Sequence, residues 1–157
     1  HMIGHLQKNK VKSVVGSFDL IHSVDSLALA KAIDNRACAL ETSQQILLQV
    51  NVSGESSKYG LSPEAVPSIV HSIASMKHVQ LCGLMTIPPI GATSQYTRAI
   101  FRQLRSLATD IKREKIDGIE MTELSMGMSD DYEIAIEEGA TMVRIGRGIF
   151  GARKAQA

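Results

Sequence analysis

Short apolar runs alternate with amphipathic helical patterns along the whole of this chain. Five helical segments separate the apolar runs, and a short helical turn follows the last of them. Such regular alternation predicts an α/β protein with a parallel sheet and right-handed crossovers. Six units fit either an open doubly wound sheet or an incomplete barrel, because a complete (β/α)8 barrel needs about 200–250 residues and this chain has 157. The six predicted strands are residues 2–6, 19–24, 45–52, 79–87, 123–126 and 141–145.

Residues that favour helix ends mark where several of the helices begin. Asp25 or Ser26 can cap the helix after the second strand, and Ser62, followed by a proline, can start the helix after the third. Ser129 is interpreted as the cap of a later helix that has two aspartates in its first turn. In the long predicted helix 96–115, one set of charged side chains is expected to form a solvated outer face. That set is Arg98, Arg102, Arg105 and Lys112.

The composition is nearly neutral and poor in aromatic residues. A net charge of +1, an aromatic content of 4% and the lack of a basic block disfavour a nucleic-acid partner. No apolar run reaches the roughly 18 residues of a membrane span, and the start of the sequence has no signal-peptide character, so a cytoplasmic protein without a membrane partner is expected. Cys38 and Cys82 form no CxxC motif and are expected to be buried free thiols. The five histidines form no metal-binding pair, so no metal is expected.

Two glycine-rich runs follow the last two predicted strands. They are residues 125–129, with the sequence SMGMS, and residues 144–151, with the sequence RIGRGIFG. Two such loops in succession near the end of an alternating chain are what a (β/α)8 barrel uses to hold a phosphate. The second run also matches GxGxxG, but a dinucleotide fold needs about 30 residues of βαβ structure and six residues remain after it. We therefore expect a phosphorylated small ligand rather than a dinucleotide.

The donors expected at this phosphate site come from both runs. In the second run, Gly146 and Arg147 offer backbone N–H groups and one guanidinium. In the first run, Ser125 and the backbone around Met126 and Gly127 are the candidates. The helix-capping serine of that run already has a structural role and is not expected to touch the phosphate.

One arginine and three lysines need a separate interpretation. Arg144 lies within an apolar strand pattern, so an inward guanidinium either forms a structural ion pair or faces a ligand, and the sequence leaves both open. A lysine that forms a Schiff base is normally desolvated. Lys8, Lys10 and Lys58 all lie in polar runs and are expected to be solvated.

Several runs, taken in order over nearly the whole chain, resemble the pyridoxal 5′-phosphate homeostasis protein family. The SMGMSxD and VRIG…IFG runs are the most specific of them. The runs are residues 3–10, 21–25, 83–85, 124–130, 142–146 and 149–151. The resemblance implies a pyridoxal 5′-phosphate (PLP) binding (β/α)8 TIM-type barrel of the alanine racemase N-terminal-domain type, without known catalytic turnover, acting in cofactor and amino-acid homeostasis.

The resemblance also implies roles for the candidate residues. Ser125 with its neighbouring backbone, together with Gly146 and Arg147, would hold the PLP phosphate, although position 147 is often Thr in the family. Arg144 would face the pyridine nitrogen. An arginine there, in place of a carboxylate, disfavours the protonated ring and so weakens PLP as an electron sink.

One departure from the family pattern concerns the N-terminal side. In the family, the PLP-bearing lysine lies on the first strand, well before the IGHLQ run with which this sequence begins. Residues 1–157 are therefore expected to be a single domain of six βα units that lacks about the first two. PLP would then be bound non-covalently or not at all, and open barrel edges would favour self-association.

Two enzymatic alternatives remain open at this point. A PLP-dependent racemase would need a buried lysine and a second acid/base domain. A phosphate-ligand barrel isomerase would need a carboxylate at a strand end with a nearby histidine, for which Asp25 and His22 are the loose match.

Overall fold

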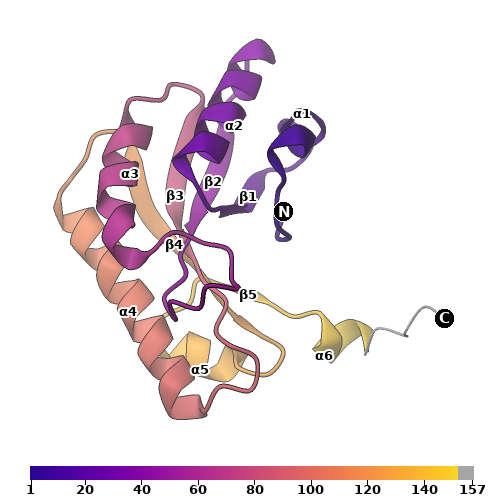
Figure 1. Cartoon of the computed structure of the whole chain (residues 1–157), viewed down its shortest axis with the longest axis vertical. Helices are drawn as coiled ribbons and strands as arrows, with labels where there is room; N and C mark the ends of the chain where they lie inside the picture. The colour runs from indigo at the N-terminus through magenta and orange to yellow at the C-terminus, as the bar shows by residue number, and fades with distance from the viewer. Residues whose placement is uncertain (152–157) are drawn as a thin grey trace.

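The computed structural model describes residues 1–151, and five strands in this part of the chain form one parallel sheet. The strands lie in the order of the sequence, so each pairs with the next and no strand is skipped (Figure 1). Right-handed crossovers between successive neighbours put every connecting helix on the same face of the sheet. The sequential order therefore selects an incomplete barrel over a doubly wound sheet, in which the order reverses. The strands are β1 (Leu20–Val24), β2 (Gln44–Gln49), β3 (Val79–Met85), β4 (Ile119–Met128) and β5 (Met142–Arg144).

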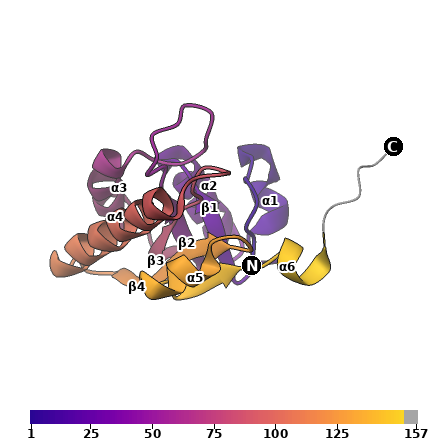
Figure 2. The same cartoon turned by 90° about the horizontal axis from the view of Figure 1, so that it is seen from below.

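The helices cover the outer face of the sheet, as Figures 1 and 2 show. Short 3₁₀ turns at Lys8–Lys10 and Pro63–Ala65 lead into α1 and α3 respectively. The last helix, α6, points away from the sheet in both views. The helices are α1 (Val11–Val14), α2 (Leu27–Ala39), α3 (Val66–Ala74), α4 (Ser94–Arg113), α5 (Tyr132–Glu137) and α6 (Arg147–Phe150).

Two hydrophobic clusters lie on opposite faces of the sheet. The larger packs the outer face of the strands against the helices and includes Ile33, Val70 and Phe101. The smaller cluster is formed by residues of β1, β2 and β3, with Met142 of β5 beside them: Leu20, Leu47, Cys82 and Met85. Because side chains alternate along a strand, these residues lie on the face away from the helices.

The strand predicted at residues 2–6 does not form. Met2 makes one bridge to β1, donating its amide to Leu20 O and accepting from His22 N, both at 2.9 Å. Two residues later Ser23 Oγ donates to Gly4 O at 2.6 Å, so a side chain takes the place of a further ladder bond. The prediction of six strands is therefore wrong by one. The opposite error occurs at β4, which extends well beyond the predicted residues 123–126. The prediction was too short because Glu120 and Glu123 interrupt the apolar pattern of this strand.

The predicted helix caps are correct in part. Ser26 caps α2 by accepting a hydrogen bond from Leu29 N at 3.2 Å. Ser62 precedes the 3₁₀ turn before α3, but its side chain makes no capping hydrogen bond within the described chain. The long predicted helix is α4, whose cap is Thr93, accepting from Tyr96 N at 3.3 Å.

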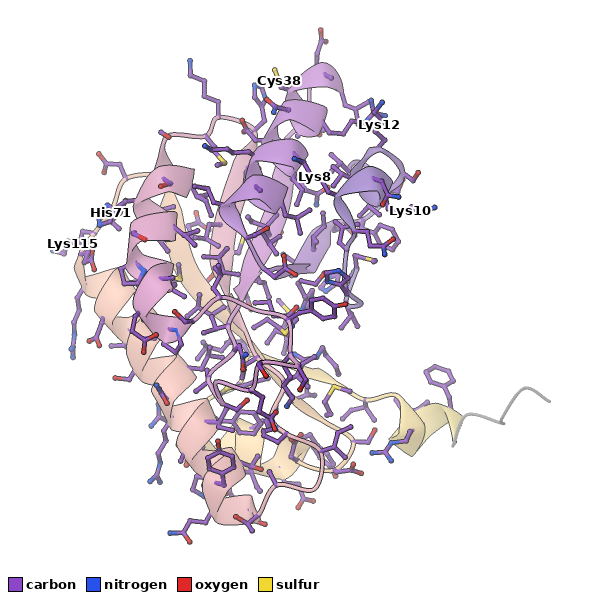
Figure 3. All side chains as sticks on the ribbon, in the orientation of Figure 1. Lys8, Lys10, Lys12, Cys38, His71 and Lys115 are labelled. Atoms are coloured by element: carbon purple, nitrogen blue, oxygen red, sulfur yellow. The ribbon has the colours of Figure 1, made fainter. Side chains whose placement is uncertain are left out.

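The expected solvated face of α4 is confirmed for Arg102, Arg105 and Lys112, which are exposed, whereas Arg98 is half-buried. The three arginines of this face also pair with the buried carboxylate of Glu138, a contact that the helix pattern does not predict. The prediction of two buried thiols is half correct, since Cys82 is buried and Cys38 is exposed near the end of α2 (Figure 3). In both cases the sequence pattern of the helix itself does not reveal which neighbour packs against it.

Candidate functional site

The two glycine-rich runs lie side by side in the structure. They lie at the carboxyl ends of β4 and β5, which are paired in parallel with Met128 opposite Arg144. This adjacency is what the sequence analysis expected. Carboxyl ends of parallel strands are where barrels and other α/β sheets carry their ligand sites.

A cavity of about 520 Å³ opens between these two runs. It is lined by two glycines and a serine, together with one methionine, one arginine and one phenylalanine. The lining residues are Met128, Ser129, Gly146, Arg147, Phe150 and Gly151. The cavity thus includes two of the six predicted site residues, Gly146 and Arg147.

Ser129 lies in this cavity and does not cap α5. That helix begins three residues later, at Tyr132, and Asp131 occupies its N-cap position. Asp131 Oδ1 accepts from Met128 N at 2.5 Å, which closes the turn after β4. The Ser129 hydroxyl instead accepts from Gly148 N at 3.1 Å and so joins the two runs. The predicted cap is wrong because the aspartate two residues later takes over the turn.

Gly146 and Arg147 present polar groups at the start of α6. The first N–H groups of a helix have no intrahelical acceptor, so the amides of these residues are free to bind a ligand. A Cβ added at Gly146 would meet no atom within 4 Å. The Arg147 guanidinium is exposed and pairs with the carboxylate of Asp130. An anion bound here would therefore compete with Asp130 for this guanidinium.

The other three candidates of the first run are buried and do not line the cavity. Ser125 and Met126 are both fully inaccessible to solvent. Gly127 has a φ of 95°, and a Cβ there would lie 2.5 Å from the Cβ of Ala135, so α5 rests directly on its backbone. The binding role expected for these three residues therefore stays a prediction.

Arg144 lies at the end of β5, 93% buried, and holds the ends of two other strands. Its Nη1 donates to Ser125 Oγ at 2.6 Å and its Nη2 donates to Thr86 O at 2.9 Å. Its Nε is also buried and has no hydrogen-bond partner among residues 1–151. Burial lowers the pKa of Arg144 to about 10, which leaves the guanidinium charged at neutral pH. A buried donor without a partner is costly, and Nε is the one guanidinium nitrogen of Arg144 that no described residue satisfies.

His22 completes this buried network and was missed as a site residue. Its Nδ1 lies 2.8 Å from Ser125 Oγ. Because a guanidinium only donates, the Ser125 hydroxyl accepts from Arg144, and it also shares a hydrogen bond with His22. Burial, and then the charges of Arg144 and of the N-terminus, lower the pKa of His22 to about 4, so the ring is neutral. The sequence did offer one signal for His22. It lies two residues after Leu20 on β1, so the two side chains point to the same face of the strand.

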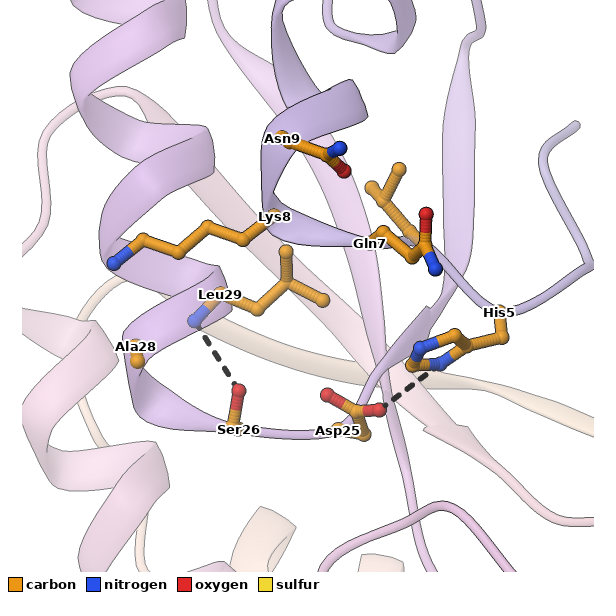
Figure 4. Close-up of a pocket in the computed structure, with 9 residues that line it drawn as sticks. His5, Gln7, Lys8, Asn9, Asp25, Ser26, Ala28 and Leu29 are labelled. Carbon is orange, nitrogen blue, oxygen red and sulfur yellow. Dashed lines mark hydrogen bonds and ion pairs between the residues drawn. The ribbon is translucent and has the colours of Figure 1, made fainter.

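The isomerase alternative required His22 beside Asp25, and the structure does not bring them together as a pair. Asp25 Oδ2 instead lies 3.3 Å from the Nδ1 atom of His5, whose ring stacks on Tyr59. Figure 4 shows this pair in a second cavity, of about 480 Å³, near the start of α2. The histidine expected to act with this carboxylate belongs to the Arg144 network.

The three lysines considered from the sequence are placed as expected. Lys8 and Lys10 are exposed near α1 (Figure 3). Lys58 is partly exposed, pairs with Glu55 at 2.9 Å and lies in a polar loop. Within the described residues, no helix is long and apolar enough to cross a membrane.

Comparison with known proteins identifies the class to which this fold and site belong. The family model for the N-terminal domain of alanine racemase matches residues 1–154. The chain is 46% identical over 154 residues to a pyridoxal phosphate homeostasis protein of Aquifex aeolicus, and 42% identical over 153 residues to one of Pseudomonas aeruginosa. These alignments cover 98% of this chain, and 67% and 64% of the two relatives.

A solved structure agrees with these sequence matches. PipY of Synechococcus elongatus PCC7942, solved with PLP bound, superposes with a TM-score of 0.86 at 40% identity, covering 94% of this chain and 68% of PipY. The fold is thus that of the alanine racemase N-terminal domain. Within this class, the chain belongs to the pyridoxal phosphate homeostasis protein family. It spans about two-thirds of the length of the relatives it matches.

Proposed function

We propose that this chain binds PLP non-covalently at the carboxyl ends of β4 and β5, as a non-catalytic protein of cofactor and amino-acid homeostasis. The observation that carries the proposal is Arg144, a buried guanidinium with an unpartnered Nε at the end of β5. PLP offers both a phosphate and a ring nitrogen that can accept a hydrogen bond. The names of the relatives and the PLP bound to PipY support the choice of this ligand.

The residues divide between the two ends of the cofactor in this proposal. Gly146, Arg147 and Ser129 would hold the phosphate in the cavity, where free amides and one guanidinium lie together. Arg144 would face the ring nitrogen, with Ser125 holding the guanidinium from the other side. Bound PLP supplies an electron-withdrawing ring, and a charged arginine at its nitrogen limits that effect because it disfavours the protonated ring. This is the physical reason for proposing binding without turnover.

The five strands would form part of a (β/α)8 barrel in this proposal. The relatives' greater length supports it, since the matched part is about two-thirds of each. Lys58 is not proposed as a covalent anchor, because it is ion-paired with Glu55 in a polar loop. An exposed, protonated lysine reacts poorly with an aldehyde at neutral pH.

The first experiment tests whether binding is reversible. The chain is incubated with PLP, dialysed, reduced with borohydride and mapped by mass spectrometry. We expect scattered, substoichiometric lysine labelling, and competition by inorganic phosphate when binding is measured before dialysis. A single stoichiometric adduct that survives dialysis would refute non-covalent binding.

The second experiment tests the phosphate contact. Gly146→Val should abolish binding of inorganic phosphate in titration calorimetry, because the side chain would block approach to the free amides. The fold should be preserved, since a Cβ at this position meets no atom within 4 Å. Gly4→Val is the matched control, because Gly4 has the same open surroundings and lies outside the cavity. Unchanged phosphate binding in Gly146→Val would reject this site.

A further inference from the structure

Three arginines on one face of α4 converge on a single buried carboxylate. Arg98 Nη1 donates to Glu138 Oε1 at 2.8 Å, and Arg102 Nε donates to Glu138 Oε2 at 3.0 Å. Arg105 Nη2 lies 3.4 Å from the same Oε2, and its Nη1 donates to the backbone oxygen of Glu138 at 3.1 Å. The spacing of the three arginines along α4, at i, i+4 and i+7, places them on one helix face. The side chain of Glu138 is 4% exposed, although its position in the sequence looks like an ordinary surface glutamate.

Glu138 follows directly after α5, so the three arginines fix the end of that helix. α5 has only six residues, Tyr132–Glu137, and one turn and a half of helix is not stable by itself. α5 contacts both β4 and α4. The position of α5 therefore depends on contacts at its two ends, and Glu138 provides the contact to α4.

α5 in turn supports the loop that lines the candidate phosphate cavity. Its Ala135 packs on the backbone of Gly127, where an added Cβ would lie 2.5 Å away. At its start, Asp131 Oδ1 accepts from the Met128 amide at 2.5 Å. Met128 and the next residue, Ser129, both line the cavity. A chain of direct contacts thus leads from α4 through Glu138 and α5 to Ser129.

We propose that Glu138 is a positioning residue for the anion cavity, because it clamps α5 to α4 and so holds the Met128–Ser129 loop in its binding geometry. This inference rests on the proposed phosphate site, and it names Glu138 as a residue outside the cavity that holds the site in place. Glu138 itself touches no ligand in this proposal. Its effect is transmitted through the packing of α5 against Gly127.

The neighbouring glutamate offers a matched control. Glu137 pairs with Arg98 alone and its side chain is 60% exposed. Glu138→Gln and Glu137→Gln each remove one negative charge at adjacent positions. Loss of a negative charge alone would strengthen the binding of an anion, so weaker binding in Glu138→Gln has to come from lost positioning.

The experiment combines phosphate titration with hydrogen exchange. We expect Glu138→Gln to raise the Kd for inorganic phosphate about fivefold to tenfold, in the range of couplings transmitted through packed elements, and Glu137→Gln to leave it within about twofold. The Met128 and Ser129 amides should exchange faster in Glu138→Gln, while amides of β2 keep their wild-type rates. A role in global stability alone would speed exchange in both places. Arg102→Gln is a milder second variant if Glu138→Gln does not fold, with the exposed Arg113→Gln as its control.

The outcomes separate this inference from the proposed function. Local exchange that does not change in Glu138→Gln overturns the inference, whether or not the wild-type chain binds phosphate. Faster local exchange with an unchanged Kd in a wild-type chain that binds phosphate also overturns it. If the wild-type chain binds neither phosphate nor PLP, the proposed function fails, and the exchange measurement alone decides whether Glu138 orders this loop.

Discussion

His22, Ser125 and Arg144 come from three different strands and share one hydroxyl group. Ser125 Oγ accepts from Arg144 at 2.6 Å and lies 2.8 Å from His22 Nδ1. Burial, and then the charge of Arg144, lower the pKa of His22 and so keep its ring neutral beside this buried positive charge. At the residue scale, the interior of the site is thus one cation held by neutral partners, without a carboxylate.

The neutral state of His22 can be tested directly. We expect its NMR titration to give a pKa of about 4, below its ordinary value of 6.5, mainly because the ring is buried. Arg144→Met removes the second cause of the shift, so the pKa should rise and still remain below 6.5. His71, an exposed ring paired with Glu114, serves as the internal reference in both proteins. A His22 pKa that does not respond to Arg144→Met would contradict the network.

At the scale of the elements, one glycine decides how closely β3 and β4 approach. A Cβ built on Gly83 would lie 1.9 Å from the backbone oxygen of Glu123, on the neighbouring strand. The register between the two strands shifts between Leu81 and Gly83, at the same place. The absence of a side chain here lets β4 curve toward β3 and carries Ser125 to its position opposite Met85.

Gly83→Ala should therefore destabilise the chain by about 2 kcal/mol or more, as overpacking against a rigid backbone does. The measurement is urea unfolding followed by circular dichroism. Gly4→Ala is the control and should stay within about 0.5 kcal/mol, because an added Cβ at Gly4 meets no atom within 4 Å. Equal stability of the two variants would show that β3 and β4 can separate without cost.

At the scale of the whole molecule, the free energy of unfolding should fall in two pH ranges as the solution is acidified, one for His22 and one for Glu138. His22 has a lowered pKa, so the unfolded chain binds a proton first and stability falls as the pH drops from 6.5 toward 4. The hydrogen bond from Arg98 lowers the pKa of Glu138, so the stability that this carboxylate provides is present above about 4.5 and is lost as the pH falls through its lowered value.

The free energy of unfolding should decrease by at most about 1.4 kcal/mol per pH unit across the His22 range, which corresponds to one proton. Chemical unfolding at a series of pH values measures this slope. His22→Gln should flatten the curve between pH 6.5 and 4 and keep the steeper loss below it. A wild-type curve that is flat over this range would contradict the assignment.

The exposed apolar residues at the end of β5 and on α6 lead to a prediction about assembly. Val143, Ile149 and Phe150 are 37%, 69% and 85% exposed, beside an edge strand of three residues. Unpaired strand edges and exposed apolar patches favour association, so we expect this chain to form dimers in sedimentation equilibrium. Phe150→Lys should weaken the dimer about tenfold or more, whereas Ile90→Lys, on an exposed loop elsewhere, should not. A wild-type chain that stays monomeric at high concentration would refute the prediction.

The sequence by itself determined the class of fold, the neighbouring placement of the two glycine-rich runs and the resemblance to a family. These features depend on local patterns, since strand–helix alternation and glycine at strand ends act over a few residues. Three details of the site depended on contacts between distant residues. In the tertiary structure, Ser129 lines the cavity and does not cap a helix. Ser125 contacts His22 and Arg144, and the buried Glu138 pairs with three arginines.

The physical reason is that a polar side chain pairs with the groups that lie within hydrogen-bond distance. Across strands, the register of the sheet determines which groups these are. The aspartate two residues after Ser129 reaches the Met128 amide and so frees the serine for Gly148. Arg144 meets Thr86 and Ser125 because β3, β4 and β5 are adjacent in the sheet. The sequence identified which residues carry polar chemistry, and the packing of the strands and of α4 against α5 decided which of them act together.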